Sequence, residues 1–111
     1  MMKMKKQGFL LYLKQKKRND KILIFNDIEP KAPVHFLAIP KKHIESANDI
    51  NEENNFLIGH IYKVIAELAK KFNVEKSGYR IVNNCGNDGG QSVKHIHFHV
   101  MGGRKFNWPP G

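Results

Sequence analysis

The feature that most constrains the fold is the stretch Lys94-His95-Ile96-His97-Phe98-His99-Val100-Met101, in which a histidine occupies every second position. Side chains that alternate with period two predict a β-strand, because neighbouring side chains of a strand point to opposite faces. We expect a strand over 93–101 whose apolar residues face a core. Its three imidazoles should then lie in a row, roughly 7 Å apart at a rise of about 3.3 Å per residue.

A glycine-rich turn, Gly86-Asn87-Asp88-Gly89-Gly90-Gln91-Ser92, stands directly before this strand. Exposed backbone N–H groups in such a turn can bind an anion, and imidazoles beside it can act as acids and bases. The two features together indicate an anion site with acid-base groups next to it.

The rest of the chain predicts one α+β domain, since 111 residues is the usual size of a single domain. Runs rich in β-branched and aromatic residues predict five strands of an antiparallel sheet. The first two should form a hairpin over 9–26, and the full set is expected at 9–14, 21–25, 34–39, 79–83 and 93–101. One long helix is expected over 51–72, because its apolar residues recur at intervals of three and four. They are Leu57, Ile61, Val64, Ile65, Leu68 and Phe72.

Charge is concentrated at the start of the chain, where residues 1–21 hold eight of the nineteen Lys and Arg residues and one acid. We expect a disordered basic arm over 1–8, then a domain over 9–111 that ends in an irregular tail at 104–111. The arm could attract RNA or another polyanion weakly, or it could only keep the chain solvated. No apolar run approaches the ~20 residues of a membrane span, so no membrane partner is expected. A single cysteine, Cys85, favours a reducing compartment such as the cytoplasm.

Two kinds of chemistry fit the histidines. Two imidazoles on one strand face can bind zinc, with a third ligand from elsewhere such as His35. Alternatively, a neutral imidazole can attack a phosphate as a nucleophile while its neighbours donate protons and hydrogen bonds. The glycine-rich turn favours phosphate, and a strand with histidines only as surface filler explains neither feature.

The motif His95-Ile96-His97-Phe98-His99-Val100 resembles the pattern of the histidine triad family. Further stretches resemble the Hint branch of that family, the nucleoside phosphoramidases, in the same order and spacing over 22–111. They are Phe25-Asn26-Asp27-Ile28, Ala32-Pro33-Val34-His35-Phe36-Leu37, Ile39-Pro40-Lys41-Lys42-His43-Ile44, Gly78-Tyr79-Arg80, Asp88-Gly89-Gly90-Gln91-Ser92-Val93, Gly102-Gly103-Arg104 and Trp108-Pro109-Pro110-Gly111.

The resemblance implies a hydrolase that cleaves the P–N bond of purine nucleoside 5′-phosphoramidates such as AMP-lysine, and that also hydrolyses aminoacyl-adenylates, without a metal or cofactor. His97 would be the nucleophile, and His99, His95, His35 and Ser92 would assist it. The alternatives are a dinucleoside polyphosphate hydrolase or nucleotidyltransferase of the same family, or a nucleotide-binding scaffold with little activity.

The resemblance also implies a nucleotide site in which Asp27 accepts hydrogen bonds from the ribose hydroxyls. Its full set of residues would be Phe25, Asn26, Asp27, Ile28, Leu37, Asn84, Gly90, Gln91, Ser92, Val93, His97 and His99. Members of this branch are homodimers whose two five-stranded sheets join, with Trp108 reaching the partner's site. We expect this protein in the cytoplasm, with the nucleus as a second location. Residues 1–20 do not match the family's usual start, and they lack the cysteines that hold a structural zinc in some relatives.

Overall fold

The computed structural model describes residues 21–111, and within this part no helix is long and apolar enough to cross a membrane. The expected basic arm over 1–8 and the expected strand over 9–14 lie outside the described residues. These two predictions therefore stay predictions.

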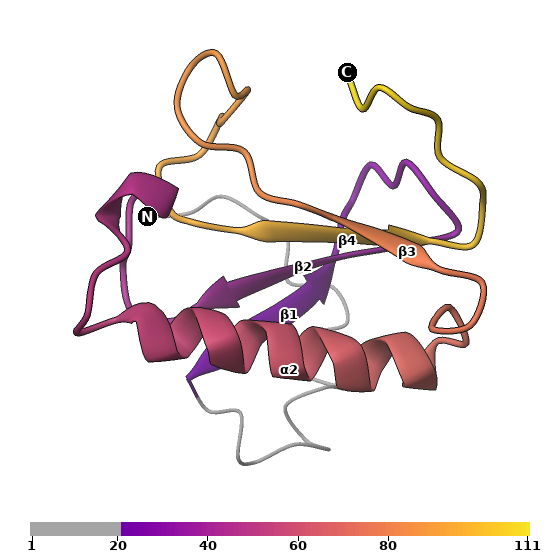
Figure 1. The fold of residues 1–111 in the computed structure, drawn as a ribbon, viewed down its shortest axis with the longest axis horizontal. Coiled ribbons are helices and arrows are strands. Elements are labelled where there is room, and N and C mark those ends of the chain that lie inside the picture. The colour runs from indigo at the N-terminus through magenta and orange to yellow at the C-terminus, as the bar shows by residue number, and fades with distance from the viewer. Residues whose placement is uncertain (1–20) are drawn as a thin grey trace.

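The described residues form one antiparallel sheet of four strands in the order β1-β2-β4-β3 (Figure 1). Its strands are β1 (Ile22–Asn26), β2 (Val34–Pro40), β3 (Tyr79–Val82) and β4 (Phe98–Gly102). The prediction of an antiparallel α+β fold is confirmed. The described part of the sheet has four strands rather than five, since the other strand was expected in residues that the structure does not describe.

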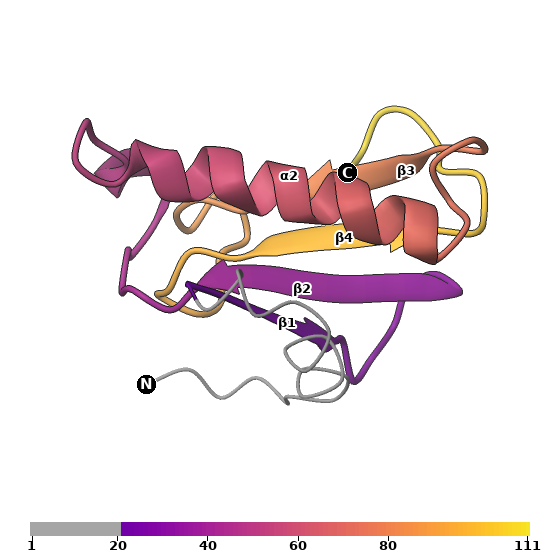
Figure 2. The ribbon, with the colours of Figure 1, turned by 90° about the horizontal axis from the view of Figure 1, so that it is seen from below.

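The helix α2 (Asn55–Lys71) runs along one face of the sheet (Figure 2). Its buried residues include five of the six expected from the apolar stripe: Leu57, Ile61, Val64, Ile65 and Leu68. They pack against Phe36 and Ala38 of β2 and Phe98 and Val100 of β4. This packing fixes which face of each strand turns away from the helix.

Both ends of the helix differ from the expected range of 51–72. Asn51 N–H donates to Asn54 Oδ1 over 2.8 Å and Asn54 N–H donates to Asn51 Oδ1 over 3.0 Å, which ties these residues into a turn before the helix. Phe72 follows the last helical residue and is 42% exposed, although its ring lies 5.7 Å from that of Phe36. A short 3-10 helix, η2 (Ala47–Asp49), precedes the turn.

The last strand begins at Phe98, so the prediction of a strand over 93–101 is wrong for the residues before it. β2 and β4 pair up to Ala38 opposite Phe98, and the same register would place Ile96 opposite Pro40. Proline has no N–H to donate, so the ladder cannot continue there. Instead, the N–H of Ile96 donates to the carbonyl oxygen of Ile44 over 2.6 Å. His95 and His97 therefore lie in an irregular segment and only His99 lies on the strand.

Candidate functional site

His35 of β2 and His99 of β4 meet on the sheet face that turns away from α2. Both alternate with residues that face the helix, so their own side chains point to the other side. The Nε2 atom of His35 lies 3.0 Å from Nδ1 of His99, and the ring centroids are 5.2 Å apart. The two imidazoles are joined by a direct side-chain hydrogen bond.

The direction of this bond follows from the other partner of His35. The N–H of Lys31 donates to Nδ1 of His35 over 3.0 Å, so that nitrogen carries a lone pair. A neutral imidazole with a lone pair on Nδ1 carries its proton on Nε2. His35 therefore donates from Nε2 to Nδ1 of His99, and His99 must carry its own proton on Nε2.

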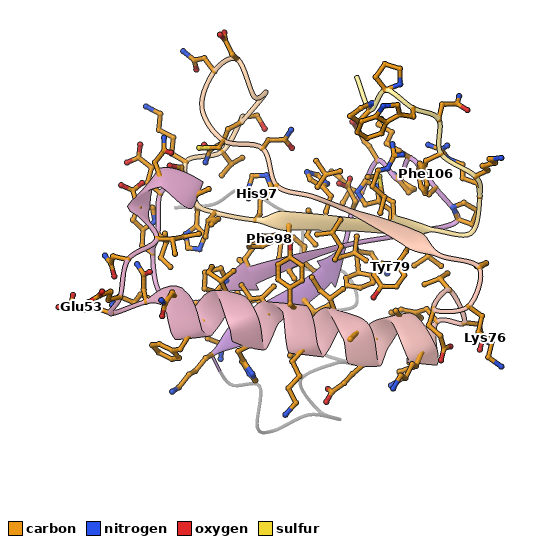
Figure 3. The ribbon with its side chains drawn as sticks, in the orientation of Figure 1. Glu53, Lys76, Tyr79, His97, Phe98 and Phe106 are labelled. Atoms are coloured by element: carbon orange, nitrogen blue, oxygen red, sulfur yellow. The ribbon has the colours of Figure 1, made fainter. Side chains whose placement is uncertain are left out.

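His97 has the opposite arrangement. Its Nδ1 lies 2.8 Å from the carbonyl oxygen of His95, which can only accept, so Nδ1 carries the proton. The lone pair of His97 is then on Nε2. Figure 3 shows the side chain of His97 on the far side of β4 from α2, whereas Phe98 points toward the helix. The His97 and His99 rings lie 5.4 Å apart, edge to face, so the lone pair and the Nε2–H group belong to neighbouring side chains.

His95 is held by a main-chain contact with the last residue of β2 and by a side-chain contact with His43. Its Nε2–H donates to the carbonyl oxygen of Pro40 over 2.8 Å, which leaves a lone pair on Nδ1. His43 Nδ1 lies 3.1 Å from that atom and is the donor. The side chain of Asn83, the residue that follows β3, donates to the carbonyl oxygen of His97 over 2.8 Å and so holds the same segment.

Burial favours the neutral form of the His35, His95 and His99 imidazoles. Loss of hydration lowers the pKa of His35, His95 and His99 below the ordinary 6.5, because a protonated ring is disfavoured away from water. Asp27 opposes this lowering of the pKa at His35 and His99, while the neighbouring histidines add to it at His95 and His99. Near neutral pH these rings therefore act as neutral donors and acceptors with the tautomers given above.

Asp27 completes the cluster. Its Oδ2 lies 3.4 Å from Nε2 of His35 and 3.8 Å from Nδ1 of His99. Its Oδ1 accepts the N–H of Glu29 over 2.8 Å. The ligand atoms of Asp27, His35 and His99 all lie within 4.8 Å of one another, which is close enough for one metal ion.

The tautomer of His35 disfavours such an ion. A metal would take the Nε2 lone pair and leave the proton on Nδ1, where the N–H of Lys31 already points. Two N–H groups would then face each other. The arrangement suits a chain of hydrogen bonds better than a metal centre.

Side-chain amides of Asn84 and Gln91 hold the glycine-rich turn in place through hydrogen bonds to main-chain groups. Asn84 Nδ2 donates to the carbonyl oxygen of Gly89 over 2.7 Å. Gln91 accepts the N–H of Gly86 and donates to the carbonyl oxygens of Glu45 and Val93. A Cβ on Gly89 would lie 2.3 Å from the carbonyl oxygen of Cys85, so only glycine fits there. The turn is exposed and leads through the exposed Ser92 into the histidine segment.

A pocket of about 370 Å³ opens beside the histidine pair. Its lining residues are Asn26, Asp27, Ile28, Pro30, Pro33, Val34, His35, Phe36 and Phe72. Phe25 and Leu37 do not line it and are instead buried together with Ile39. The carboxylate of Asp27 is thus shared between the pocket and the histidine cluster.

Comparison with known proteins shows the family of this chain. The family model described as the HIT domain matches residues 15–106. The chain belongs to the HIT domain family. An uncharacterized HIT-like protein of Buchnera aphidicola subsp. Baizongia pistaciae (strain Bp) is 41% identical to this HIT protein over 90 residues, which are 81% of this chain and 80% of the relative.

Solved structures of similar proteins support the same family assignment. The HIT family hydrolase from Legionella pneumophila Philadelphia 1 superposes with a TM-score of 0.81 at 47% identity, over 83% of this chain and 82% of that one. The histidine triad nucleotide-binding protein from Candida albicans gives a TM-score of 0.61 at 25% identity, over 92% of this chain and 83% of that one. At the level of the family, this HIT protein resembles hydrolases and nucleotide-binding proteins.

The predicted site residues of this HIT protein fall into groups in the structure. Asp27, His35, His97 and His99 come together, and His95 is bonded to His97 through its carbonyl group. Asn84 and Gln91 use their amides inside the turn, so their predicted contacts with a nucleotide stay predictions. Phe25 and Leu37 lie in the buried cluster with Ile39, and their role in a nucleoside pocket also stays a prediction.

The sequence did not indicate three groups that form hydrogen bonds with the site histidines. They are the N–H of Lys31, the His43 ring and the Asn83 amide. The N–H of Lys31 has no signal in the sequence, because every residue except proline carries one. His43 appeared only within a stretch that resembles the Hint branch, 39–44, and no role was assigned to it.

Proposed function

We propose that this HIT protein is a nucleoside phosphoramidase of the Hint branch. It would hydrolyse the P–N bond of purine nucleoside 5′-phosphoramidates and release a nucleoside monophosphate and an amine. The observation that carries the proposal is the hydrogen bond from Nδ1 of His97 to the carbonyl oxygen of His95, because it leaves a lone pair on Nε2 for attack. The resemblance to a HIT family hydrolase and to a nucleotide-binding relative supports it.

In the first step, Nε2 of His97 attacks phosphorus and forms a new N–P bond while the P–N bond to the amine breaks. The bonding pair stays on the amine nitrogen, which leaves with a proton delivered from solvent through the Ser92 hydroxyl. His97 becomes positively charged as it forms this bond. The carbonyl oxygen of His95 lies 2.8 Å from its Nδ1 and stabilises that charge.

His99 acts on the phosphate oxygens in the same step. Its Nε2–H group donates to a non-bridging oxygen and stabilises the negative charge that develops there. Nδ1 of His99 accepts from Nε2 of His35, so the donor stays in the correct tautomer and orientation. The backbone N–H groups of Gly90 and Val93 would assist at the other oxygens.

In the second step, a water molecule attacks phosphorus from the side that the amine left. An O–P bond forms, the bond from phosphorus to Nε2 of His97 breaks, and the water's proton passes to solvent. His97 regains its lone pair and its neutral form. The product is a nucleoside monophosphate, so the two steps together consume one water molecule.

The nucleoside would lie next to Asp27, whose carboxylate would accept hydrogen bonds from the ribose hydroxyls. Asn26 and Ile28 line the pocket beside it and would contact the sugar or base. Phe25 and Leu37, which are buried together with Ile39, would also contribute to the nucleoside pocket in this proposal. This placement favours ribonucleotides over deoxyribonucleotides.

We also propose that the protein acts as a homodimer. Trp108 is 82% exposed in the single chain, which is unusual for a large aromatic side chain and typical of an interface residue. Among the described strands β3 lies at an edge of the sheet, so a second sheet can pair there. Sedimentation velocity should give a dimer that Trp108→Ala weakens; a monomer at all concentrations would overturn this proposal.

The activity is tested by trapping the intermediate. Wild-type protein is mixed with an adenosine 5′-phosphoramidate and quenched in alkali, where a phosphorus–histidine bond survives. Intact-mass and peptide mass spectrometry should find one added adenylyl group on His97. The Ser77→Ala variant, changed in a turn away from the site, serves as the control and should give the same adduct. Release of AMP without an adduct, or an adduct only from dinucleoside polyphosphates, would contradict the proposed function.

A further inference from the structure

The C-terminal segment of the chain lies against the loop between β1 and β2. Nε of Arg104 donates to the carbonyl oxygen of Lys31 over 2.8 Å, although 73 positions separate the two residues. Gly103, at a φ of +92°, packs so closely on Pro33 that a Cβ there would lie 2.9 Å from the proline ring. In Figure 1 the yellow tail and the purple β1–β2 loop lie on the same side of the molecule.

The exposed side chain of Arg104 is held in one orientation by several contacts. Its guanidinium carbon lies 4.2 Å from the centroid of the Phe106 ring, and Nη1 donates to the carbonyl oxygen of Lys105 over 3.1 Å. Arg80 of β3 lies 5.1 Å from the same ring and donates to the carbonyl oxygen of Asn107 over 3.0 Å. Stacking on an aromatic ring orients a guanidinium group even at the surface.

Lys31 is thereby bonded at both ends of its backbone. Arg104 holds its carbonyl oxygen, and its N–H donates to Nδ1 of His35 over 3.0 Å. His35 in turn donates to Nδ1 of His99 over 3.0 Å. A continuous series of contacts therefore runs from the C-terminal tail to the imidazole that would face the phosphate.

We propose that Arg104 is a positioning residue that fixes the backbone of Lys31 and so determines which nitrogen of His35 carries the proton. Without Arg104, the Lys31 N–H group would leave Nδ1 of His35 for part of the time. The His35 ring could then place its proton on either nitrogen, and its donation to His99 would be lost in one of the two forms. The kinetic consequence rests on the proposed phosphoramidase function, whereas the effect on the tautomer of His35 does not.

The direct test is NMR of protein with ¹⁵N-labelled histidine, because the chemical shifts of the two ring nitrogens report which one is protonated. In the wild type, His35 should be protonated at Nε2. In Arg104→Ala, both His35 signals should move toward each other as the two tautomers mix. Arg104→Lys keeps the charge but lacks the planar Nε–H group, and it should give a smaller shift in the same direction. The control Lys105→Gln removes a neighbouring positive charge and should leave the His35 signals unchanged.

Turnover supplies the second readout. Arg104→Ala should lower kcat by about three- to tenfold, the effect expected for losing the orientation of one hydrogen-bonded group, and should change KM by less than about twofold. Unchanged His35 signals in both Arg104 variants would overturn the inference, even if activity fell. A wild-type protein without turnover would overturn the proposed function instead, and the NMR comparison would still decide the role of Arg104.

Discussion

The four histidines of the site form two pairs that are held in different ways. His35 and His99 lie on the paired strands β2 and β4 and bond to each other through their rings. His95 and His97 lie in the irregular segment before β4 and bond to main-chain carbonyl oxygens. The strand pair therefore carries its protons on Nε2, whereas His97 carries its proton on Nδ1.

This difference separates the chemistry of side chains that look equivalent in the sequence. A main-chain carbonyl oxygen at Nδ1 of His97 leaves its Nε2 lone pair free, which is what the proposed role as nucleophile requires. A ring nitrogen at the same position turns His99 into a donor. The role of each imidazole depends on its hydrogen-bond partner more than on its place in the alternating motif.

The largest expected effect is on the pair before β4. His97→Ala should lower kcat by about a thousandfold or more, because the proposed covalent intermediate forms on the Nε2 lone pair of this residue. Turnover of a fluorogenic adenosine phosphoramidate measures this. His60→Ala, a matched change on α2, should retain wild-type turnover. If His97→Ala kept more than a tenth of the activity, the division of roles between the pairs would be wrong.

A substitution in the strand pair should reduce turnover less than His97→Ala does. His99→Ala should reduce kcat by about a hundredfold, the usual effect of losing one donor to a developing negative charge. The adenylyl group should still reach His97, only more slowly, in a rapid-quench experiment. An adduct that forms at the wild-type rate would show that His99 does not contribute to the first step.

Among the four site histidines, Asp27 contacts those of the strand pair, His35 and His99, so its replacement tests that pair from outside the imidazoles. Asp27→Asn keeps an oxygen for the N–H of Glu29 but removes the carboxylate charge. It should lower kcat/KM for ribonucleotide substrates by about tenfold, the effect of roughly one hydrogen bond, and leave 2′-deoxyribonucleotide substrates nearly unchanged. Equal losses for both sugars would argue against a ribose contact at Asp27.

The smallest effect concerns stability at acidic pH. The pKa values of His35 and His99 are below 6.5 in the folded protein, so the unfolded chain binds more protons once the pH falls below that value. The free energy of unfolding should therefore decrease on acidification, by at most about 1.4 kcal/mol per pH unit for each histidine.

Urea denaturation at a series of pH values measures this slope. His35→Asn combined with His99→Asn should reduce the slope, and the lowered pKa of His95 still contributes to the dependence that is left. If the free energy of unfolding changed with pH equally in the variant and the wild type, groups other than His35 and His99 would be responsible for the dependence.

The sequence predicted the sheet class and the helix because these depend on the spacing of side chains. The apolar stripe from Leu57 to Leu68 is one example, and the alternation along β2 is another. The grouping of His35 with the histidines of the motif rested on the resemblance to the histidine triad family. The predicted start of β4 was wrong because it depends on which residue of β2 lies opposite each residue of β4. Pro40 ends the ladder only in the observed register, and sequence spacing alone does not give that register.

The tautomers of the histidines could not be predicted for a similar reason. They depend on the N–H of Lys31 and the carbonyl oxygens of Pro40 and His95, which are groups that any residue can supply. The positions of these groups follow from tertiary structure. One example is the contact between Arg104 and Lys31, which are 73 positions apart in the sequence.

The most direct test of the account is the protonation state of the ring nitrogens in wild-type protein near neutral pH. ¹⁵N NMR of labelled histidines should show His97 protonated at Nδ1, with a lone pair on Nε2, and both His35 and His99 protonated at Nε2. A His97 ring protonated at Nε2 would remove the nucleophile and contradict the account.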